Sequence, residues 1–354
     1  MRLDECGWSP SVSEQFEQHA RGGLAPGRVI ADLGALFRLA GEAGEIDAVP
    51  AGRLRRSGER PAVGDWAAFL PPAAAGGPAR IEALLPRRGR LARKSAGTST
   101  AEQVVAANVD VVIVVMGLDD DFNLRRLERF LVMSWQGGAR PVVLLNKSDL
   151  ADDPEARRAE TEAAAPGVPV LTASCRTGDG LDALAPHLPP GETAALLGSS
   201  GVGKSTLINR LLGEEVQATR EVRARDRRGR HVTSHRELFR LPGGALLIDN
   251  PGVRELAPWR GEQGLAGAFD DVEALAAGCR FRDCTHGGEP GCAVAAAVDE
   301  GRLAGERLES YRTLQRELDY LARKQDVAAQ LAEKRKWRAI HRSIRWMPKR
   351  GRGD

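Results

Sequence analysis

The most specific chemistry in the sequence lies in a glycine-rich stretch that could hold phosphates. Residues 198–206 read Gly-Ser-Ser-Gly-Val-Gly-Lys-Ser-Thr and match the pattern G-x-x-x-x-G-K-[ST]. A strand-like run at 193–197 precedes them and a helix-like run at 206–212 follows, which is the context that such a loop requires. Glycines let backbone N–H groups wrap a phosphate chain at a helix N-terminus. Lys204 is expected to reach the β- and γ-phosphates, and Ser205 to bind Mg²⁺. The residues expected to contact the nucleotide here are Gly198, Ser199, Ser200, Gly201, Val202, Gly203, Lys204, Ser205 and Thr206.

A second motif concerns the base of the nucleotide. Asn146-Lys-Ser-Asp149 follows the apolar run 141–145. The Asp149 carboxylate could accept hydrogen bonds from guanine N1–H and N2–H₂, which adenine lacks, so it would select GTP. Lys147 is expected to lie across the base, and Asn146 to tie this loop to the phosphate loop.

A third motif, Ser174-Cys-Arg176, stands where such sites usually have Ser-Ala-Lys. We expect the backbone N–H of Cys175 to meet guanine O6, with Ser174 beside it. The alternative for Cys175 is a reactive thiol or a metal ligand, but no partner for that chemistry is near in the sequence.

Asp249-Asn-Pro-Gly252 completes the set after the strand-like run 245–248. Asp249 is expected to hold Mg²⁺ through water, Gly252 to contact the γ-phosphate, and Thr233 to act as the switch threonine. In a Ras-like GTPase the phosphate loop comes first, whereas here the two base motifs precede it. Joining the ends of the sheet elsewhere leaves the same site, so the order predicts a circularly permuted GTPase whose switch segment leads directly into the C-terminal domain.

Hydrolysis requires a residue that orients water, and Ras-like enzymes place Gln just after the D-x-x-G motif. Here that residue is Val253, which cannot do so, and slow intrinsic hydrolysis follows. His231 is the expected catalytic histidine, together with Lys204 and Thr233. His235 is the second choice, and a surface histidine without a catalytic role is the alternative.

A cysteine-rich stretch near the C-terminus predicts a metal site. Cys279, Cys284, His286 and Cys292 supply three thiolates and one imidazole, a closed tetrahedral set suited to one structural Zn²⁺. The alternatives are a disulfide with one free thiol, or three unrelated thiols. Cys6 has no evident role.

Elements that position these motifs can be read from the hydrophobic pattern. Short strand-like runs between residues 27 and 94, separated by Gly and Pro, favour a small β-barrel of the OB or SH3 kind. Continuous β-branched runs at 111–115 and 141–145, with a helical pattern at 123–135 between them, predict an α/β sheet. Apolar residues at three- and four-residue steps over 308–321 predict an amphipathic helix.

The resulting fold class is multidomain α/β. It comprises an N-terminal OB-like β-barrel, a circularly permuted P-loop GTPase α/β domain and a mostly helical, zinc-binding C-terminal domain. We expect a flexible lead over 1–25, an RNA-binding barrel over 26–98, the GTPase domain over 99–262, and the zinc domain with a basic helical tail over 263–354.

The composition and the distribution of charge bear on two questions: whether the chain binds nucleic acid, and whether it is secreted or spans a membrane. The chain has 354 residues, and its formal net charge of only +3 would argue against nucleic acid as a partner. The basic residues are unevenly spread, however, because 220–240 holds eight arginines against three acidic residues, and 301–354 holds fifteen basic against seven acidic residues. Each run could be a plain solvated face. Two such runs, with Trp337 and Trp346 in the second, favour nucleic acid. No secretory or membrane-spanning run is expected.

The combined pattern resembles the RsgA (YjeQ) family of circularly permuted GTPases that depend on the small ribosomal subunit. Supporting matches outside the motifs are 61–66, 108–110, 122–127 and 334–337. The family's switch loop usually reads Arg-His-Thr-Thr-Thr, and here it is Arg230-His-Val-Thr-Ser234; its usual Asp-Thr-Pro-Gly is Asp249-Asn-Pro-Gly here. The resemblance implies an OB-fold domain, GTP hydrolysis stimulated by the small subunit and a late role in that subunit's maturation.

This reading predicts GTP or GDP with Mg²⁺ and one structural Zn²⁺ as cofactors. It predicts the small ribosomal subunit and its 16S rRNA as partners, no membrane partner, a monomer and a cytoplasmic location. Two alternatives stay open: an RNA-binding assembly scaffold that senses GTP or GDP with weak hydrolysis, and a metal-dependent regulator unrelated to ribosomes.

Overall fold

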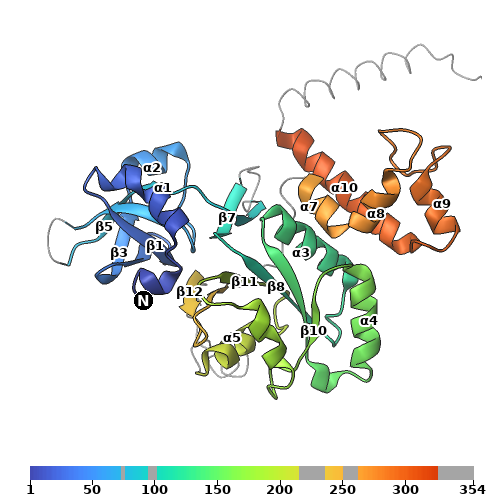
Figure 1. The fold of residues 1–354 in the computed structure, drawn as a ribbon, viewed down its shortest axis with the longest axis horizontal. Coiled ribbons are helices and arrows are strands. Elements are labelled where there is room, and N and C mark those ends of the chain that lie inside the picture. The colour runs from blue at the N-terminus through green and yellow to red at the C-terminus, as the bar shows by residue number, and fades with distance from the viewer. Residues whose placement is uncertain (73–75, 95–101, 215–235, 250–261, 326–354) are drawn as a thin grey trace, which may run out of the picture.

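Figure 1 shows the computed structural model of the chain, which describes all residues except 73–75, 95–101, 215–235, 250–261 and 326–354. The strands are β1 (Ala25–Asp32), β2 (Phe37–Gly41), β3 (Gly44–Pro50), β4 (Trp66–Leu70), β5 (Ala79–Leu84), β6 (Arg90–Lys94), β7 (Glu102–Ala107), β8 (Val111–Gly117), β9 (Arg140–Asn146), β10 (Val170–Thr172), β11 (Thr193–Leu197), β12 (Arg236–Arg240) and β13 (Leu246–Asp249). The α-helices are α1 (Pro10–Ala20), α2 (Gly52–Ser57), α3 (Leu124–Gln136), α4 (Pro154–Ala164), α5 (Lys204–Leu212), α7 (Glu262–Ala268), α8 (Asp270–Ala276), α9 (Ala293–Asp299) and α10 (Gly305–Gln325). Short 3₁₀ helices are η1 (Asp4–Cys6), η2 (Ser148–Leu150) and η3 (Leu181–His187).

The expected N-terminal barrel is confirmed. Its strands follow the order β1-β2-β3-β5-β4, and β4 pairs back onto β1, so the barrel closes. Alternating inward positions fill its interior, including Val29, Phe37, Leu39 and Ile81, each at most 1% exposed. Strand-like runs at 28–30, 36–39, 64–70 and 80–85 of the sequence correspond to β1, β2, β4 and β5, whereas no such run indicated β3.

The prediction of a flexible lead over residues 1–25 is wrong. Ser9 caps α1, because its Oγ accepts from Val12 N at 3.4 Å, and Pro10 provides the fixed φ that suits the first helical turn. Val12 and Phe16, one turn apart, are buried at 2% and 8% exposure. Two apolar residues are too few to reveal the helix face in the sequence, although they are enough to anchor it.

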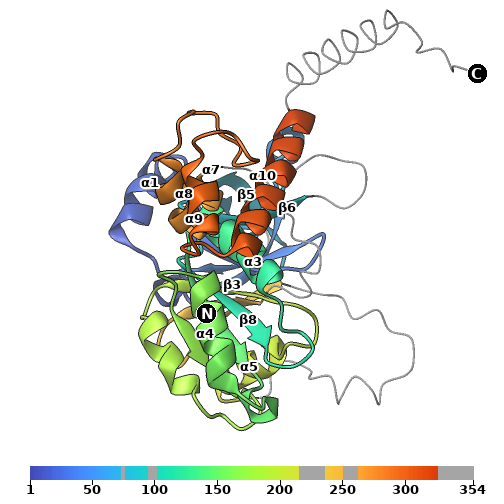
Figure 2. The same ribbon diagram turned by 90° about the vertical axis from the view of Figure 1, so that its right-hand side faces the viewer.

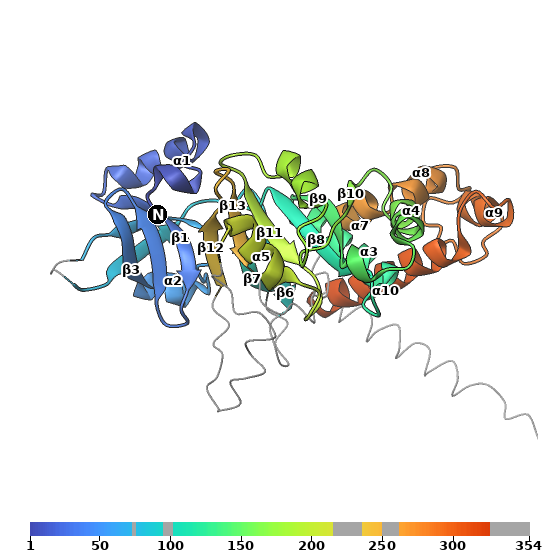
Figure 3. The same cartoon turned by 90° about the horizontal axis from the view of Figure 1, so that it is seen from below.

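The expected α/β domain is also present. Its part of the sheet runs β10-β9-β8-β11-β13-β12, parallel except for β12. The helix α3 packs on one face, where Leu127 and Leu131 join the side chains of Val112 and Val114. The helix α5 packs on the other face, where Leu207 and Ile208 join the remaining strand residues. Figure 3 shows β9, β8 and β11 side by side, with α5 over β11.

The barrel and the α/β sheet form one continuous sheet, which the sequence did not reveal. Strand β12 pairs antiparallel with β1, with Ala31 opposite Glu237 and Asp32 opposite Arg236. An eleven-stranded sheet results. A separate hairpin of β6 and β7 spans the expected boundary at residues 98–99, so a cut there would divide the hairpin.

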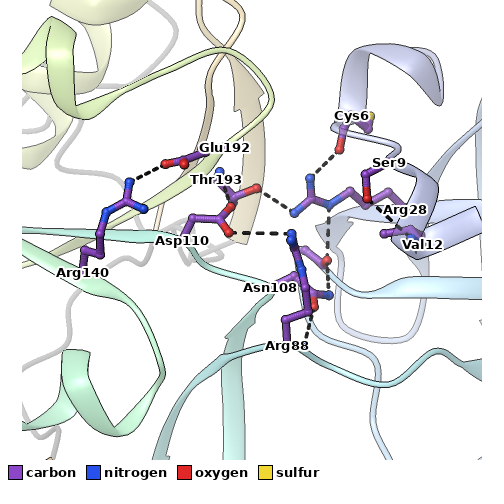
Figure 4. Close-up of polar contacts among 11 residues, drawn as sticks. Cys6, Ser9, Val12, Arg28, Arg88, Asn108, Asp110, Arg140, Glu192 and Thr193 are labelled. Carbon is purple, nitrogen blue, oxygen red and sulfur yellow. Dashed lines mark hydrogen bonds and ion pairs between the residues drawn. The ribbon is translucent and has the colours of Figure 1, made fainter. Parts of the chain in front are cut away.

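Polar contacts also connect the barrel to the α/β sheet, as Figure 4 shows. The guanidinium of Arg28, 2% exposed, donates to Cys6 O, to Gly64 O at 3.2 Å and to Thr193 Oγ1 at 2.8 Å. It also lies over the Trp66 ring at 4.9 Å. Burial lowers the pKa of Arg28 to about 10, which leaves it charged at neutral pH. One side chain therefore links the N-terminal segment, the barrel and strand β11.

The C-terminal region is mostly helical, as expected. In Figures 1 and 2, α10 lies beside α3. Arg307, 7% exposed, makes the principal contact: it donates to Glu128 Oε1 at 2.9 Å and to Asp271 Oδ1 at 2.9 Å. Arg129 pairs with Glu317 through two contacts of 2.6 Å. The basic tail over 326–354 lies outside the described residues.

Candidate nucleotide and metal sites

The sheet brings the separate motifs to one edge. Strands β9, β8, β11 and β13 are parallel neighbours, so their carboxyl ends share an edge, where ligands bind in open α/β sheets. The base motif begins at the end of β9, the phosphate loop follows β11, and Asp249 ends β13. The order along the chain is permuted, but the sheet restores their proximity.

The phosphate loop has the backbone that its sequence requires. Gly198, Gly201 and Gly203 have φ values of 156°, 83° and 105°. A Cβ at Gly203 would lie 2.3 Å from Asn146 Nδ2, and one at Gly198 would lie 2.5 Å from Val115 O, so neither position has room for a side chain. The loop leads directly into α5, which begins at Lys204.

Lys204 lies inside this loop, 8% exposed. Its Nζ donates to Gly198 O at 2.8 Å and to Ser199 O at 2.6 Å. Burial lowers the pKa of Lys204, while the charges of Asp249 and then Asp121 oppose that shift. The structure therefore surrounds the ammonium with backbone carbonyls and holds two carboxylates near enough to favour its charged form.

Asn146 makes the connection that the sequence predicted. Its Nδ2 donates to Val202 O at 2.7 Å, within the phosphate loop. Its Oδ1 accepts from the backbone N–H of Cys175 at 2.8 Å. The buried amide of Asn146 thus connects its own loop to the phosphate loop and to the loop that contains Cys175. The Cys175 N–H is used by Asn146 here, so the expected contact to guanine O6 requires this bond to be shared or exchanged.

The Cys175 thiol has no reactive character in this position. The residue is 1% exposed, and burial raises the pKa of Cys175 to about 12. The thiol is thus shielded from solvent, and the metal-binding cluster found among the described residues does not include it. The geometry favours the packing interpretation, in which the backbone N–H rather than the thiol makes the functional contact.

Asp149 is held by two neighbours. Its Oδ1 accepts from Ser174 Oγ at 2.5 Å, and its Oδ2 accepts from Arg176 Nη2 at 2.6 Å. The Ser174 contact, followed by the Arg176 contact, lowers the pKa of Asp149, which keeps the carboxylate ionised. The sequence placed Ser174 at this site but did not reveal that Arg176 contacts Asp149.

Two further acidic residues at the site were missed altogether. The β8–α3 loop, residues 118–123, lies between the base motif and the phosphate loop. Asp119 Oδ2 is 2.6 Å from Lys147 Nζ, and Asp121 Oδ2 accepts from Ser199 Oγ at 2.5 Å. No motif of the sequence indicated these partners. The only available signal was their position directly after a buried parallel strand.

Some predicted residues cannot be placed. Thr233, His231 and the second choice His235 lie outside the described residues, as do Gly252 and Val253. Their roles in switching and hydrolysis stay predictions. Ser200 is exposed at the loop tip, and Ser205 and Thr206 are half-buried in the first turn of α5.

The four predicted metal ligands converge. The ligand atoms of Cys279, Cys284, His286 and Cys292 all lie within 4.8 Å of one another. His286 Nδ1 is 3.6 Å from Cys279 Sγ and 3.5 Å from Cys292 Sγ, and the two sulfurs are 3.9 Å apart. Tetrahedral zinc with Zn–S bonds of about 2.3 Å requires such separations. They are far longer than the roughly 2.05 Å of a disulfide, so the disulfide alternative does not describe this geometry.

The chain around this cluster is shaped to hold it. Gly288 and Gly291 have φ values of 111° and 79°, as the turns around a metal require. Glu289 accepts from the backbone N–H groups of Thr285 at 2.9 Å and Gly287 at 2.6 Å. Cys292 caps α9, because its Sγ accepts from Ala295 N at 3.3 Å.

Comparisons with known proteins agree with this geometry. A family model described as RsgA GTPase matches residues 84–259. The small ribosomal subunit biogenesis GTPase RsgA of Syntrophotalea carbinolica is 45% identical, with 100% of each chain covered. The protein of the same name from Opitutus terrae is 47% identical over 98% of this chain and 97% of its own.

Two solved structures resemble most of the architecture. YjeQ from Thermotoga maritima has a TM-score of 0.63 at 27% identity and covers 83% of this chain and 98% of its own. YloQ, described as a circularly permuted GTPase, has a TM-score of 0.60 at 26% identity and covers 84% of this chain and 95% of its own. Among the described residues, no helix is long and apolar enough to cross a membrane. With the permuted motif order and the converging loops, these matches show that the chain belongs to the RsgA GTPase family.

Proposed function

We propose that this chain is a GTPase that binds the small ribosomal subunit and hydrolyses GTP to GDP and phosphate late in that subunit's maturation, with the subunit stimulating the reaction. The observation that supports it most is the convergence on Asn146, which joins the phosphate loop to the guanine-recognition loops at 2.7 and 2.8 Å. The relatives' names specify the subunit as the object of the activity.

Binding and selection follow from the described contacts. The ionised Asp149, oriented by Ser174, accepts the guanine N1–H and N2–H₂ donors after Arg176 has moved aside. The ammonium of Lys204 exchanges the carbonyls of Gly198 and Ser199 for phosphate oxygens. Because those carbonyl contacts already fix the side chain, little rotamer freedom is lost when the phosphates arrive.

The residues present also fit a divalent cation. Ser205 lies in the first turn of α5, and Asp249 ends strand β13 at 7% exposure, so a hydroxyl and a carboxylate flank the place of the β- and γ-phosphates. Mg²⁺ held by these two groups would neutralise the charge that develops on the phosphates. Orientation of the attacking water is assigned to His231, with Thr233 as the switch residue.

The metal cluster is proposed to hold one Zn²⁺ with a structural role. Three thiolates and one imidazole fill a tetrahedral shell and leave no position for substrate. Its ligands link the start of α9 to the chain before it, so the ion would hold this part of the C-terminal domain together.

The partner at the subunit is proposed to be 16S rRNA, contacted by the barrel and by the basic segments over 220–240 and 301–354. A monomer acting in the cytoplasm, where small subunits are assembled, without a membrane partner, completes the proposal.

The deciding experiment measures GTP turnover at increasing concentrations of purified small subunits, with Lys204→Ala as the inactive control. Turnover should rise with subunit concentration and saturate. Turnover that subunits fail to raise, together with retained subunit binding, would favour the alternative of an RNA-binding scaffold that senses GTP or GDP.

A further inference from the structure

The β8–α3 loop, residues 118–123, lies between the two parts of the proposed nucleotide site, which are the base motif and the phosphate loop. Gly117, the last residue of β8, pairs with Asn146 at the end of β9. Leu118 N donates to Asn146 O at 2.8 Å, which anchors the start of the loop beside the base motif. On the other side, β8 pairs with β11, from which the phosphate loop emerges.

One carboxylate of this loop orients the base motif. Lys147, which follows Asn146, has left-handed backbone dihedrals, φ 68° and ψ 35°. Its Nζ meets Asp119 Oδ2 at 2.6 Å, with Lys147 23% and Asp119 34% exposed. Burial raises the pKa of Asp119, but the Lys147 contact and backbone N–H groups outweigh it, so the net shift is downward. Asp119 thus remains charged and restricts the side chain expected to cover the base.

A second carboxylate orients the phosphate loop. Asp121 Oδ2 accepts from Ser199 Oγ at 2.5 Å, and Asp121 Oδ1 lies 2.8 Å from Arg126 Nη2. Arg126 also donates to Asp121 O, and Asn123 Oδ1 caps the same helix start at Arg126 N, 2.9 Å away. Asp121 is therefore fixed by the first turn of α3 and in turn fixes Ser199.

The same carboxylate acts on Lys204 at longer range. Its charge is one of two that oppose the lowering of the Lys204 pKa by burial. Because Ser199 O also accepts from Lys204 Nζ at 2.6 Å, a displaced Ser199 would release the ammonium from its present position. Anchoring Ser199 therefore fixes Lys204 as well.

From these contacts we infer that Asp119 and Asp121 are positioning residues for the nucleotide: Asp119 holds Lys147 in place for the base, and Asp121 holds the phosphate loop in place through Ser199. This rests on the proposed function, since it assigns these two carboxylates to the same guanine-nucleotide site. Neither carboxylate touches the nucleotide in this assignment, because each acts through another side chain.

The separate roles of Asp119 and Asp121 can be tested with nucleotides that differ in phosphate number. Dissociation constants of GMP, GDP and GTP are determined by calorimetry for the wild-type chain, Asp119→Ala, Asp121→Ala and Asp120→Ala. Asp120 is the matched control, because it is exposed in the same loop and is not part of these contacts. The Asp121→Ala variant should weaken GTP binding about tenfold, GDP binding less, and GMP binding least. The Asp119→Ala variant should weaken all three by a similar factor of about three to five.

The conservative variant separates positioning from folding. Asp121→Asn keeps one oxygen that can accept from Ser199 but removes the charge near Lys204, so its GTP affinity should lie between those of wild type and Asp121→Ala. Ser199→Ala deletes only a hydroxyl and should reproduce the phosphate-dependent loss. In the double variant Asp121→Ala/Ser199→Ala, the two losses should not add, since both remove one contact.

The results that would overturn the inference differ for the two carboxylates. An Asp121→Ala loss that is equal for GMP, GDP and GTP, or additive losses in the double variant, would overturn the inference for Asp121. An Asp119→Ala affinity unchanged for all three nucleotides would overturn it for Asp119. If Asp121→Ala does not fold, Ser199→Ala with GMP, GDP and GTP tests the same contact from its other side. A wild-type chain that binds none of the nucleotides would instead refute the proposed function.

Discussion

Arg307 offers a stringent test of how the C-terminal helices are attached. It donates to Glu128 Oε1 at 2.9 Å, to Ala164 O at 2.8 Å and to Ala268 O at 2.7 Å, and Ser310 Oγ also donates to Glu128. Glu128 is 4% exposed on α3. The substitution Arg307→Met keeps an unbranched apolar stem and removes the guanidinium, which leaves the Glu128 carboxylate buried without this cation.

The expected cost is large. Breaking a buried ion pair from one side costs about 3–5 kcal/mol, because the other charge stays desolvated. That is a substantial part of the roughly 5–15 kcal/mol by which a domain is stable. In this multidomain chain a single unfolding midpoint is ambiguous. We therefore expect the loss in hydrogen exchange of α10, which should accelerate about a hundredfold or more at 1.36 kcal/mol per tenfold.

The pH dependence identifies the cause. Burial raises the pKa of Glu128, while Ser310 and then Arg307 oppose the shift. Without Arg307 the folded-state pKa rises further above its unfolded value, so the folded state binds the additional proton as the pH falls. The destabilisation should therefore be greatest at pH 8 and shrink towards pH 5.5. Adding Glu128→Gln should recover part of the stability at pH 8.

The control is Arg302, an arginine that pairs with Glu300 at 2.7 Å but is 54% exposed. Arg302→Met should change stability by less than about 0.5 kcal/mol. Equal destabilisation of Arg307→Met at pH 8 and pH 5.5 would refute the argument from an unpaired carboxylate. Unchanged exchange in α10 at pH 8 would refute the importance of the contact itself.

Four further outcomes are expected. Lys204→Ala should abolish GTP hydrolysis with or without subunits, as a phosphate-release assay would show; residual stimulated turnover above a tenth of wild type would contradict the role given to the ammonium. Asp149→Asn should reduce the preference for GTP over ATP by at least about tenfold in competition binding, and unchanged selectivity would remove this residue from base recognition. His231→Ala should lower subunit-stimulated turnover while leaving GDP affinity intact, whereas lost GDP affinity would indicate a folding role. Elemental analysis should find about one zinc per chain, and Cys292→Ser should lower that content and weaken protection of α9 in hydrogen exchange; full metal content in this variant would exclude Cys292 as a ligand.

The sequence predicted those parts of the site that are local in the chain. The phosphate loop, the base motif and the cysteine cluster each have their chemistry within a few residues, so spacing alone revealed them. Strands β8 and β9 were equally visible, since buried parallel strands are continuous apolar runs.

What the sequence could not reveal depends on distant partners. Arg28 and Thr193 are 165 residues apart, and Arg307 and Glu128 are 179 apart, and such pairs leave no periodic pattern. The Asp121–Ser199 contact, 78 residues apart, has the same character. Helix α1 was missed for another reason, because its position depends on just two buried side chains and a cap.

The pairing of β12 with β1 affects whether the α/β domain can be produced as a separate fragment. Strand β12 would be the outer strand of the α/β sheet if the barrel were removed, and its backbone N–H and C=O groups towards β1 would lack partners. An exposed edge of this kind can pair with another chain and so promotes aggregation. A fragment that begins after the barrel therefore loses an intramolecular strand pair and gains an open sheet edge. Because the barrel covers that edge and is itself closed through β1 and β4, attempts to isolate the α/β part for crystallisation or assay would do better to retain the whole barrel than to cut between the expected domains.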